Sequence, residues 1–137
     1  PTEINGFLGN IQIKYLPQIL NKRNKNFIKI ARVIYKNKYK YFPIKYDHID
    51  FISNFAVPII CKSKKIRDEL VEECNGKVEI RPIVGGDMTK QPFFAKYIRG
   101  LQINTPNSNL IHEQGLYFGN NPELTDREIK ELIQIFK

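Results

Sequence analysis

The chain has 137 residues, a length that suits one domain, and 42% of its residues are hydrophobic, which is enough for a packed core. This content excludes a globally disordered chain, and the sequence shows neither a stretch long enough to span a membrane nor a signal peptide. The 22 basic and 14 acidic side chains give a net charge of +8, and the excess is local. Ten basic residues and no acidic residue lie between Ile4 and Tyr46.

Two amphipathic helices are expected in the first 36 residues. Residues 2–10 have the i, i+3, i+4, i+7 spacing of a helix, with Thr2 as its N-cap, and their apolar positions are Ile4, Phe7, Leu8 and Ile11. Pro17 ends or kinks this helix because proline lacks the backbone N–H that a helix interior uses. A second, longer helix follows, and its apolar face consists of Leu20, Phe27, Ile30, Ala31, Ile34 and Tyr35.

The pattern changes near residue 55. Residues 37–53 mix aromatic and charged side chains around Pro43, and we expect them to be irregular. Residues 55–61 predict a strand, in which Pro58 marks an edge position or a bulge.

Short helices and strands alternate over the rest of the chain. The expected elements are a helix from the Ser63 cap to about Glu73 that ends at Asn75-Gly76, a strand over 78–83, a loop at Gly85-Gly86-Asp87, a helix over 107–114 closed by Gly115, a strand over 116–118, and a helix to Phe136 opened by a capping box of Thr125 and Glu128. Two long helices followed by a small sheet with helices packed on it give an α+β architecture.

The basic segment between residues 4 and 46 allows more than one interpretation. Clustered Lys and Arg can bind a nucleic-acid backbone, and aromatic residues interleaved with lysines can stack on bases; the aromatic residues here are Tyr35, Tyr39, Tyr41 and Phe42. The simpler interpretations are a solvated helix face and pairing with an acidic surface on the part of the protein that is expected to be missing from this chain. Because no known nucleic-acid motif is present, we favour these and do not expect nucleic acid as a partner.

The cysteines and histidines predict neither a disulfide framework nor a metal site. Cys61 and Cys74 are the only cysteines, and they fit small buried side chains of a cytoplasmic protein. With two histidines and no C-x-x-C, a zinc site is not expected. His48 is expected at the surface. His112 could cap a carbonyl or contact a substrate, and we favour the structural role.

The loop after the second predicted strand is the main candidate for a binding site. It is rich in polar residues, and binding residues are common in loops at the ends of strands. The two glycines do not form a dinucleotide fingerprint, since no G-x-G-x-x-G is present. A ligand site and an ordinary polar loop both remain open. The polar residues are Arg81, Asp87, Thr89, Lys90 and Gln91.

Five ordered segments together resemble one family. They are P-T-E-I-N-G-F-L-G-N-I-Q-I-K-Y-L, F-A-V-P-I-I, V-E-I-R-P-I-V-G-G-D-M-T-K-Q-P, P-N-S-N-L-I-H-E-Q-G-L-Y-F-G-N and L-T-D-R-E-I-K-E-L-I. These segments are similar to the C-terminal part of the DegT/DnrJ/StrS nucleotide-sugar aminotransferases, beginning just after the cofactor-binding lysine. The resemblance covers nearly the whole chain.

The resemblance implies the small domain of the aspartate-aminotransferase fold, with a mainly antiparallel sheet and helices on one face. It also implies pyridoxal phosphate as cofactor, a homodimer, and a nucleotide-linked 4-keto-6-deoxy sugar as substrate, in lipopolysaccharide or surface polysaccharide synthesis. The segment R-P-I-V-G-G-D-M-T-K-Q-P is closer to the 3-dehydratase subgroup, because aminotransferases tend to have His where Lys90 stands. Both reactions remain open, since the position that separates them, a Schiff-base Lys or a His, is expected before Pro1.

By the same resemblance, Arg81, Asp87, Lys90 and Gln91 are the candidates for contacts with the sugar nucleotide. Lys90 would offer a charge to the diphosphate and Gln91 a hydrogen bond to a sugar oxygen, whereas Asp87 replaces an expected Asn. Glu3 and Asn5 would lie behind the site, near the cofactor domain.

We expect two structural parts within this chain and a third part, the cofactor-binding domain, outside it. Residues 1–46 form interdomain helices, residues 47–137 form the small α+β domain, and a large cofactor-binding domain precedes the chain. No catalytic residue is expected within this fragment. The alternatives to an enzyme fragment are a catalytically silent dimerisation domain and a basic nucleic-acid-binding module.

Overall fold

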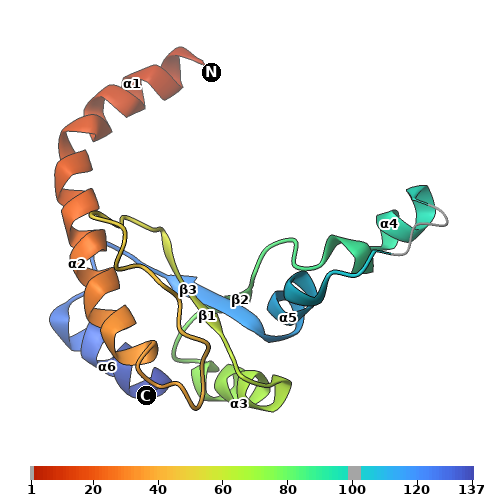
Figure 1. Ribbon diagram of the computed structural model, residues 1–137. Helices are drawn as coiled ribbons and strands as arrows, with labels where there is room; N and C mark the ends of the chain where they lie inside the picture. Colours follow the sequence, from red (N-terminus) through yellow and green to blue (C-terminus); the bar gives the residue numbers. More distant parts are fainter. Residues whose placement is uncertain (1, 99–102) are drawn as a thin grey trace.

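The computed structural model describes residues 2–98 and 103–137, and shows a small sheet, a group of helices on one of its faces, and two projecting segments (Figure 1). The elements in chain order are α1 (Glu3–Gln12), η1 (Ile13–Tyr15), α2 (Leu16–Ile34), β1 (Ala56–Ile60), α3 (Lys64–Cys74), β2 (Ile80–Pro82), η2 (Met88–Lys90), α4 (Pro92–Tyr97), α5 (Pro106–Gln114), β3 (Gly115–Gly119) and α6 (Asp126–Phe136).

The sheet has three strands in the order β1-β3-β2, and β3 is antiparallel to both neighbours. The outer strands β1 and β2 therefore run parallel to each other and are joined through α3, with β3 inserted between them. In the register, Val57 lies opposite Phe118 and Ile59 opposite Leu116, while Ile80 lies opposite Phe118 from the other side. The expected α+β fold with a small antiparallel sheet is confirmed.

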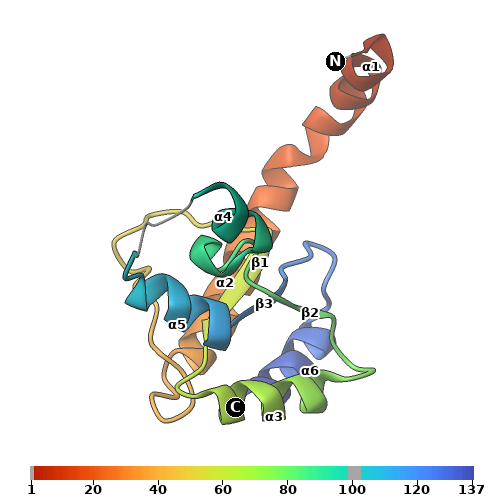
Figure 2. The ribbon, with the colours of Figure 1, turned by 90° about the vertical axis from the view of Figure 1, so that its right-hand side faces the viewer.

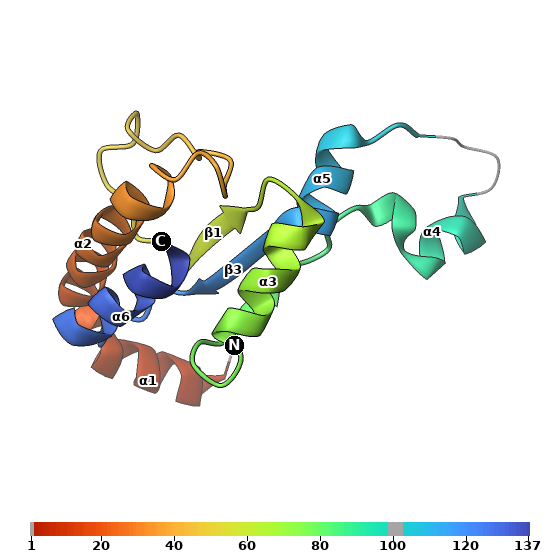
Figure 3. The ribbon, with the colours of Figure 1, turned by 90° about the horizontal axis from the view of Figure 1, so that it is seen from below.

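One face of the sheet carries the hydrophobic core, and α2, α3 and α6 pack against it (Figure 3). Because side chains alternate between the two faces of a strand, the inward residues of β1 and β3 form one apolar surface. Full burial of a large aliphatic or aromatic side chain stabilises a fold by about 1.5–3 kcal/mol, so the members of this cluster stabilise the fold through their burial. Its most buried members are Ile30, Ala31, Ile34, Tyr41, Val57, Ile59, Cys61, Cys74, Leu116, Phe118 and Phe136.

Of the two alternatives for Pro58, an edge position or a bulge, the structure shows the edge position, because β1 is an outer strand and Pro58 lies in register opposite Tyr117. Within the described part of the chain β1 pairs with β3 only, and the Tyr35 hydroxyl donates a hydrogen bond to the Pro58 carbonyl at 2.8 Å. The far end of β1 is covered by the irregular segment, because Tyr41 forms an isolated antiparallel bridge with Cys61. The edge of β1 is thus partly satisfied within the chain.

The N-terminal helices differ in how they are buried. The expected apolar face of α2 is in the core from Phe27 onward. α1 as a whole projects away from the body (Figure 2), and its apolar residues are exposed. The expected break of the first helix before Pro17 is present: α1 ends at Gln12, the 3-10 turn η1 links it to α2, and the proline occupies the first turn of α2, where its missing N–H is tolerated. Thr2 is the N-cap of α1, but its side chain makes no capping hydrogen bond to the described residues.

Local sequence signals positioned the ends of the later helices correctly. The Ser63 hydroxyl accepts the Ile66 N–H at the start of α3, and Gly76 has the positive φ of 70° that ends it. Thr125 and Glu128 form a complete capping box at α6. The predicted strand over 78–83 is shorter, Ile80–Pro82, and η2 and α4 were not predicted.

Some side chains of the basic segment make contacts within the fold. Lys22 pairs with Glu123 at 3.1 Å and Lys29 with Asp126 at 2.6 Å, which connects α2 to the start of α6. Tyr35 and Tyr41 are buried in the core, so they cannot form a stacking surface for bases. Pairing with acidic residues therefore accounts for some of these lysines.

The two cysteines are free and buried, as expected. Burial raises the pKa of Cys61 to about 11, so the thiol form is the stable one. None of the helices in the described residues is both long and apolar enough to cross a bilayer. In the same part of the chain, no group of three or more potential ligand side chains could hold a metal ion.

Candidate functional site

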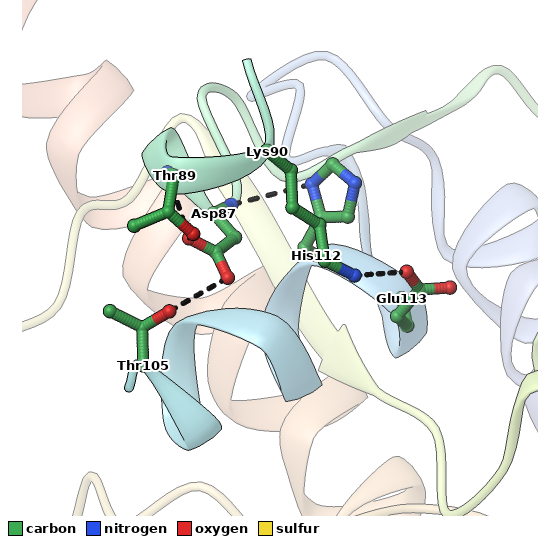
Figure 4. Close-up of polar contacts among 6 residues, drawn as sticks. All are labelled: Asp87, Thr89, Lys90, Thr105, His112 and Glu113. Atoms are coloured by element: carbon green, nitrogen blue, oxygen red, sulfur yellow. Dashed lines mark hydrogen bonds and ion pairs between the residues drawn. The ribbon is translucent and has the colours of Figure 1, made fainter. Parts of the chain in front are cut away.

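The candidate site forms around the loop that follows β2. Gly85 and Gly86 have φ values of 81° and 50°, which turn the chain back toward α5 after β2 ends at Pro82. The loop then enters η2, whose N-cap is Asp87. The predicted glycine turn is thus confirmed, and it places the polar residues of 85–91 beside α5 (Figure 4).

Asp87 is buried, with 2% of its surface exposed, and both of its carboxylate oxygens accept hydrogen bonds. Oδ1 accepts from the Thr89 N–H at 3.0 Å and the Thr89 hydroxyl at 2.7 Å, and Oδ2 accepts from the Thr105 hydroxyl at 2.8 Å (Figure 4). The hydrogen bonds from Thr89, then that from Thr105, hold the pKa of the Asp87 carboxyl below its ordinary value. Asp87 therefore ties the loop to the segment that begins α5.

His112, on α5, contacts the backbone of the same loop. Its Nδ1 accepts a hydrogen bond from the Asp87 backbone N–H at 3.3 Å. The contact depends on Gly86, because a Cβ atom at that position would lie 2.3 Å from His112 Nδ1. The imidazole therefore packs directly against the backbone of the loop.

Lys90 makes the third contact between the loop and α5. Its ammonium lies 2.7 Å from the Glu113 carboxylate, and both side chains are partly exposed (Figure 4). The hydrogen bond and charge of Lys90 lower the pKa of Glu113. Because an exposed pair of this kind contributes little to stability, Lys90 can exchange Glu113 for another anion at small cost.

A cavity of about 350 Å3 lies between this loop, β2 and α5. Its polar side chains are Arg81, Gln91, His112 and Tyr117, and backbone and apolar atoms of residues 82–86 complete it. Gln91 donates to the Gly85 carbonyl at 3.3 Å, which holds its amide at the rim. Arg81 Nε donates to Glu79 at 2.9 Å, and this hydrogen bond raises the pKa of Arg81.

The structure brings only some of the predicted site residues together. Arg81 and Gln91 line the cavity, whereas the functional groups of Asp87 and Lys90 are engaged in contacts with the loop and α5. Glu3 and Asn5 lie on α1, which projects away from the loop (Figure 2). Sequence reasoning left His112 with a structural role and did not consider Tyr117. The closely spaced glycines before Asp87 were the available signal that another side chain approaches the backbone there.

A larger cavity of about 860 Å3 lies on the other side of β2, toward α6. Arg81 and Tyr117 line both cavities, and Phe55 packs edge-on against Tyr117 with ring centroids 6.1 Å apart. The walls of this cavity combine apolar side chains with Lys77, Glu79, Glu128 and Glu131, and Glu128 is already used in the capping box. The smaller cavity remains the candidate site because it adjoins the predicted loop and lacks carboxylates among its described lining residues.

The chain does not by itself provide a site for a Schiff-base cofactor. Each of its lysines is among the described residues, and each is exposed to solvent. A lysine that holds pyridoxal phosphate needs a sheltered position, which shifts its pKa and excludes water. The described residues accordingly do not fit this cofactor on their own, and none of them is assigned a reaction step through it.

The fold identifies the general class of protein, and the sequence comparison then identifies the family. A small antiparallel sheet covered on one face by helices, with a polar loop at one edge, is the small-domain architecture of enzymes with the aminotransferase fold. The chain belongs to the DegT/DnrJ/EryC1/StrS aminotransferase family, whose sequence model matches residues 2–137.

Two curated relatives match the whole chain. GDP-4-keto-6-deoxy-D-mannose 3-dehydratase of Escherichia coli O55:H7 is 32% identical over 145 residues, and the enzyme of the same name from Yersinia pseudotuberculosis is 30% identical over 150 residues. The chain covers 36% and 35% of their lengths, so it spans about a third of each.

Solved structures agree with this assignment. The E. coli 3-dehydratase with bound hydrated PLP has a TM-score of 0.82 at 28% identity, covering 100% of this chain and 36% of that one. An aminotransferase from Psychrobacter cryohalolentis has a TM-score of 0.83 at 22% identity, covering 98% of this chain and 38% of that one, and supports the fold alone.

Proposed function

We propose that this chain is the small-domain part of a pyridoxal-phosphate-dependent enzyme that removes the 3-hydroxyl of a nucleotide-linked 4-keto-6-deoxy sugar. The observation that carries the proposal is the match of the entire chain to two 3-dehydratases at 32% and 30% identity. The cofactor supplies the electron sink for such a reaction, and the protein supplies binding and orientation.

The residues that hold the cofactor lie, on this proposal, in a large domain outside the chain. Two observations support it: the chain covers about a third of its relatives, and every lysine it contains is exposed. Residues 1–46 would then connect the large domain to the small domain formed by residues 47–137. Glu3 and Asn5 would lie behind the active site at this junction.

The loop after β2 would form one wall of the substrate site. Arg81 and Gln91 line the cavity and would donate hydrogen bonds to the sugar nucleotide. Asp87 would hold the loop in place through Thr89 and Thr105. Lys90 would either support the loop through Glu113 or move to the diphosphate, since its ion pair is weak.

The working protein would be a homodimer in the cytoplasm. The exposed apolar residues of α1 support a contact with another domain or subunit: Phe7 is 66% exposed and Ile4 70%. The two buried free cysteines fit a reducing compartment. Lipopolysaccharide or surface polysaccharide synthesis is the proposed context for the sugar product.

The decisive experiment incubates the complete enzyme with pyridoxal phosphate, glutamate and GDP-4-keto-6-deoxy-mannose, and identifies the product by NMR and mass spectrometry. We expect loss of the 3-hydroxyl. An amino sugar as the product would instead make the protein an aminotransferase. Absence of any cofactor-dependent product would contradict the proposal.

Two matched variants separate the roles of Lys90. Lys90→Ala should raise KM for the sugar nucleotide whether Lys90 binds substrate or supports the loop. Glu113→Gln should lower KM if Lys90 moves to the diphosphate, because it releases the ammonium, and should raise KM if the pair only supports the loop. Unchanged kcat/KM in Lys90→Ala would remove Lys90 from the site.

A further inference from the structure

We propose that His112 contacts the substrate, and that its two ring nitrogens have separate tasks. Nδ1 fixes the 85–91 loop through the Asp87 backbone N–H, and Nε2–H donates a hydrogen bond to a ligand oxygen in the 350 Å3 cavity. The identification of this ligand as a sugar nucleotide rests on the proposed function.

The tautomer of the neutral ring follows from the loop contact. A backbone N–H can only donate, so Nδ1 must be an acceptor and carry no proton. In a neutral imidazole the single proton is then on Nε2. The contact with Asp87 therefore selects the tautomer that presents a donor at the other nitrogen.

The position of the ring is fixed as well as its tautomer. Because the ring approaches the backbone where Gly86 has no Cβ, its Nδ1 edge is held against the loop. The imidazole also lines the cavity, and no hydrogen bond of Nε2 is found among the described residues. Nε2–H is therefore the nitrogen left for a ligand.

The chemistry of the cavity indicates the ligand class. The side chains that can donate hydrogen bonds into it are the Arg81 guanidinium, the Gln91 amide, the His112 imidazole and the Tyr117 hydroxyl. No carboxylate is among the described residues that line it, and the nearby Glu79 and Glu113 are paired with Arg81 and Lys90. Such a set of donors suits oxygen acceptors, above all the charged oxygens of a phosphate.

The first test measures the tautomer without any substitution. In the intact protein at neutral pH, the 15N shifts of the His112 ring should show a protonated Nε2 and an unprotonated Nδ1. Titration with inorganic pyrophosphate, and separately with GDP-mannose, should shift the Nε2 resonance. A response to both assigns the contact to phosphate oxygens, and a response to GDP-mannose alone assigns it to sugar oxygens. An Nδ1–H tautomer, or no response to either ligand, overturns the proposal.

The second test uses two variants that each retain one nitrogen's function. The side-chain amide of His112→Asn reaches the position of Nδ1, and that of His112→Gln reaches the position of Nε2. We expect His112→Asn to keep slow amide hydrogen exchange at Asp87 but to weaken ligand binding about tenfold or more, as for a lost hydrogen bond to a charged group. His112→Gln should lose the slow exchange and retain more of the binding. Equal binding losses in both variants would contradict separate tasks.

The two proposals fail in different ways. If the proposed enzyme activity is wrong, the wild-type protein gives no cofactor-dependent product, yet the His112 tautomer and the pyrophosphate titration still decide the present inference. If only this inference is wrong, turnover is intact and the His112 ring does not respond to either ligand.

Discussion

The body of the molecule and its two projections differ in the burial of their apolar side chains. In the body, formed by the sheet with α2, α3 and α6, the large apolar residues are buried: Phe118, Phe136 and Ile34 are at most 1% exposed. The projections are α1 with η1, and η2 with α4, and none of their described residues is buried. Phe7 is 66% and Tyr97 71% exposed.

This difference separates the part of the chain that is stabilised by its own core from the segments whose apolar side chains are free to contact another domain or subunit. A short helix gains most of its stability from packing, and isolated helices below about 12–15 residues are marginal in water. α4 has only six residues, and α1, although η1 joins it to α2, has no buried residue, so neither gains stability from packing within the described chain. The body should therefore fold as a unit, and the projections should depend on a contact outside it.

The largest expected effect is in the core. Phe118 and Phe136 stack with ring centroids 4.6 Å apart, so Phe136→Ala should lower the free energy of unfolding by about 3–5 kcal/mol. In the 137-residue chain by itself, Phe7→Ala, the matched change on α1, should cost about 0.5 kcal/mol or less, because the Phe7 side chain is exposed there. Denaturant titration of both variants gives the comparison. Equal losses would show that α1 is packed as tightly as the body.

The next effect is at the boundary between the body and the loop. Gly86→Ala should cost about 2–4 kcal/mol, because it forces a positive φ on alanine and places Cβ against His112. Gly85→Ala is the control: it also has a positive φ, but its Cβ would meet only Met88 Sδ at 3.7 Å. Hydrogen exchange at Asp87 should report the difference, and similar exchange in both variants would argue against the close His112 contact.

A smaller effect distinguishes the caps of α6 and α1. Thr125→Ala removes a hydroxyl that caps α6 and should cost about 1 kcal/mol. Thr2→Ala removes a side chain that makes no capping hydrogen bond to the described residues and should leave stability unchanged. Thermal unfolding of the two variants checks this, and a loss for Thr2→Ala would indicate that its hydroxyl is used.

The smallest expected effect is in the pH dependence. The folded state lowers the pKa of Asp87, so this carboxylate contributes stability above its unfolded pKa of about 4, and the contribution is lost as the pH falls through the lower folded value. Thr105→Val removes one donor and should raise the Asp87 pKa toward its ordinary value. Carboxyl 13C shifts measured during an acid titration test the direction. Ser108→Ala, a change at an exposed position of α5, is the control and should leave the Asp87 titration unchanged.

The parts of the fold that could be predicted are those with a local cause. Ser63, Gly76 and Thr125 set helix ends through contacts within three or four residues, and the period of the apolar residues in α2 identified its buried face. The length of β2 has no local cause, because its pairing with residues 116–118 limits it to three residues.

The same distinction explains the site. Arg81 and Gln91 could be selected as polar residues of a loop beside a strand. A structural role for His112 was expected, but as the cap of a carbonyl; its actual partner, the Asp87 backbone N–H, could not be predicted because Asp87 is 25 residues away and the contact exists only after α5 packs beside the loop. Likewise Asn120 gives no local signal, although its buried amide donates to the carbonyls of Arg23 and Asn54 and so connects the end of β3 to two distant segments.

The order of the strands has a consequence for synthesis on the ribosome. β3 is the last strand of the sheet to be made, yet both β1 and β2 pair with it rather than with each other. The sheet cannot assemble until residue 119 has left the exit tunnel, so the inward side chains of β1 must wait while residues 61–119 are made. During that interval the nascent chain presents two unpaired strands, which makes it a natural client for chaperones that bind extended apolar segments.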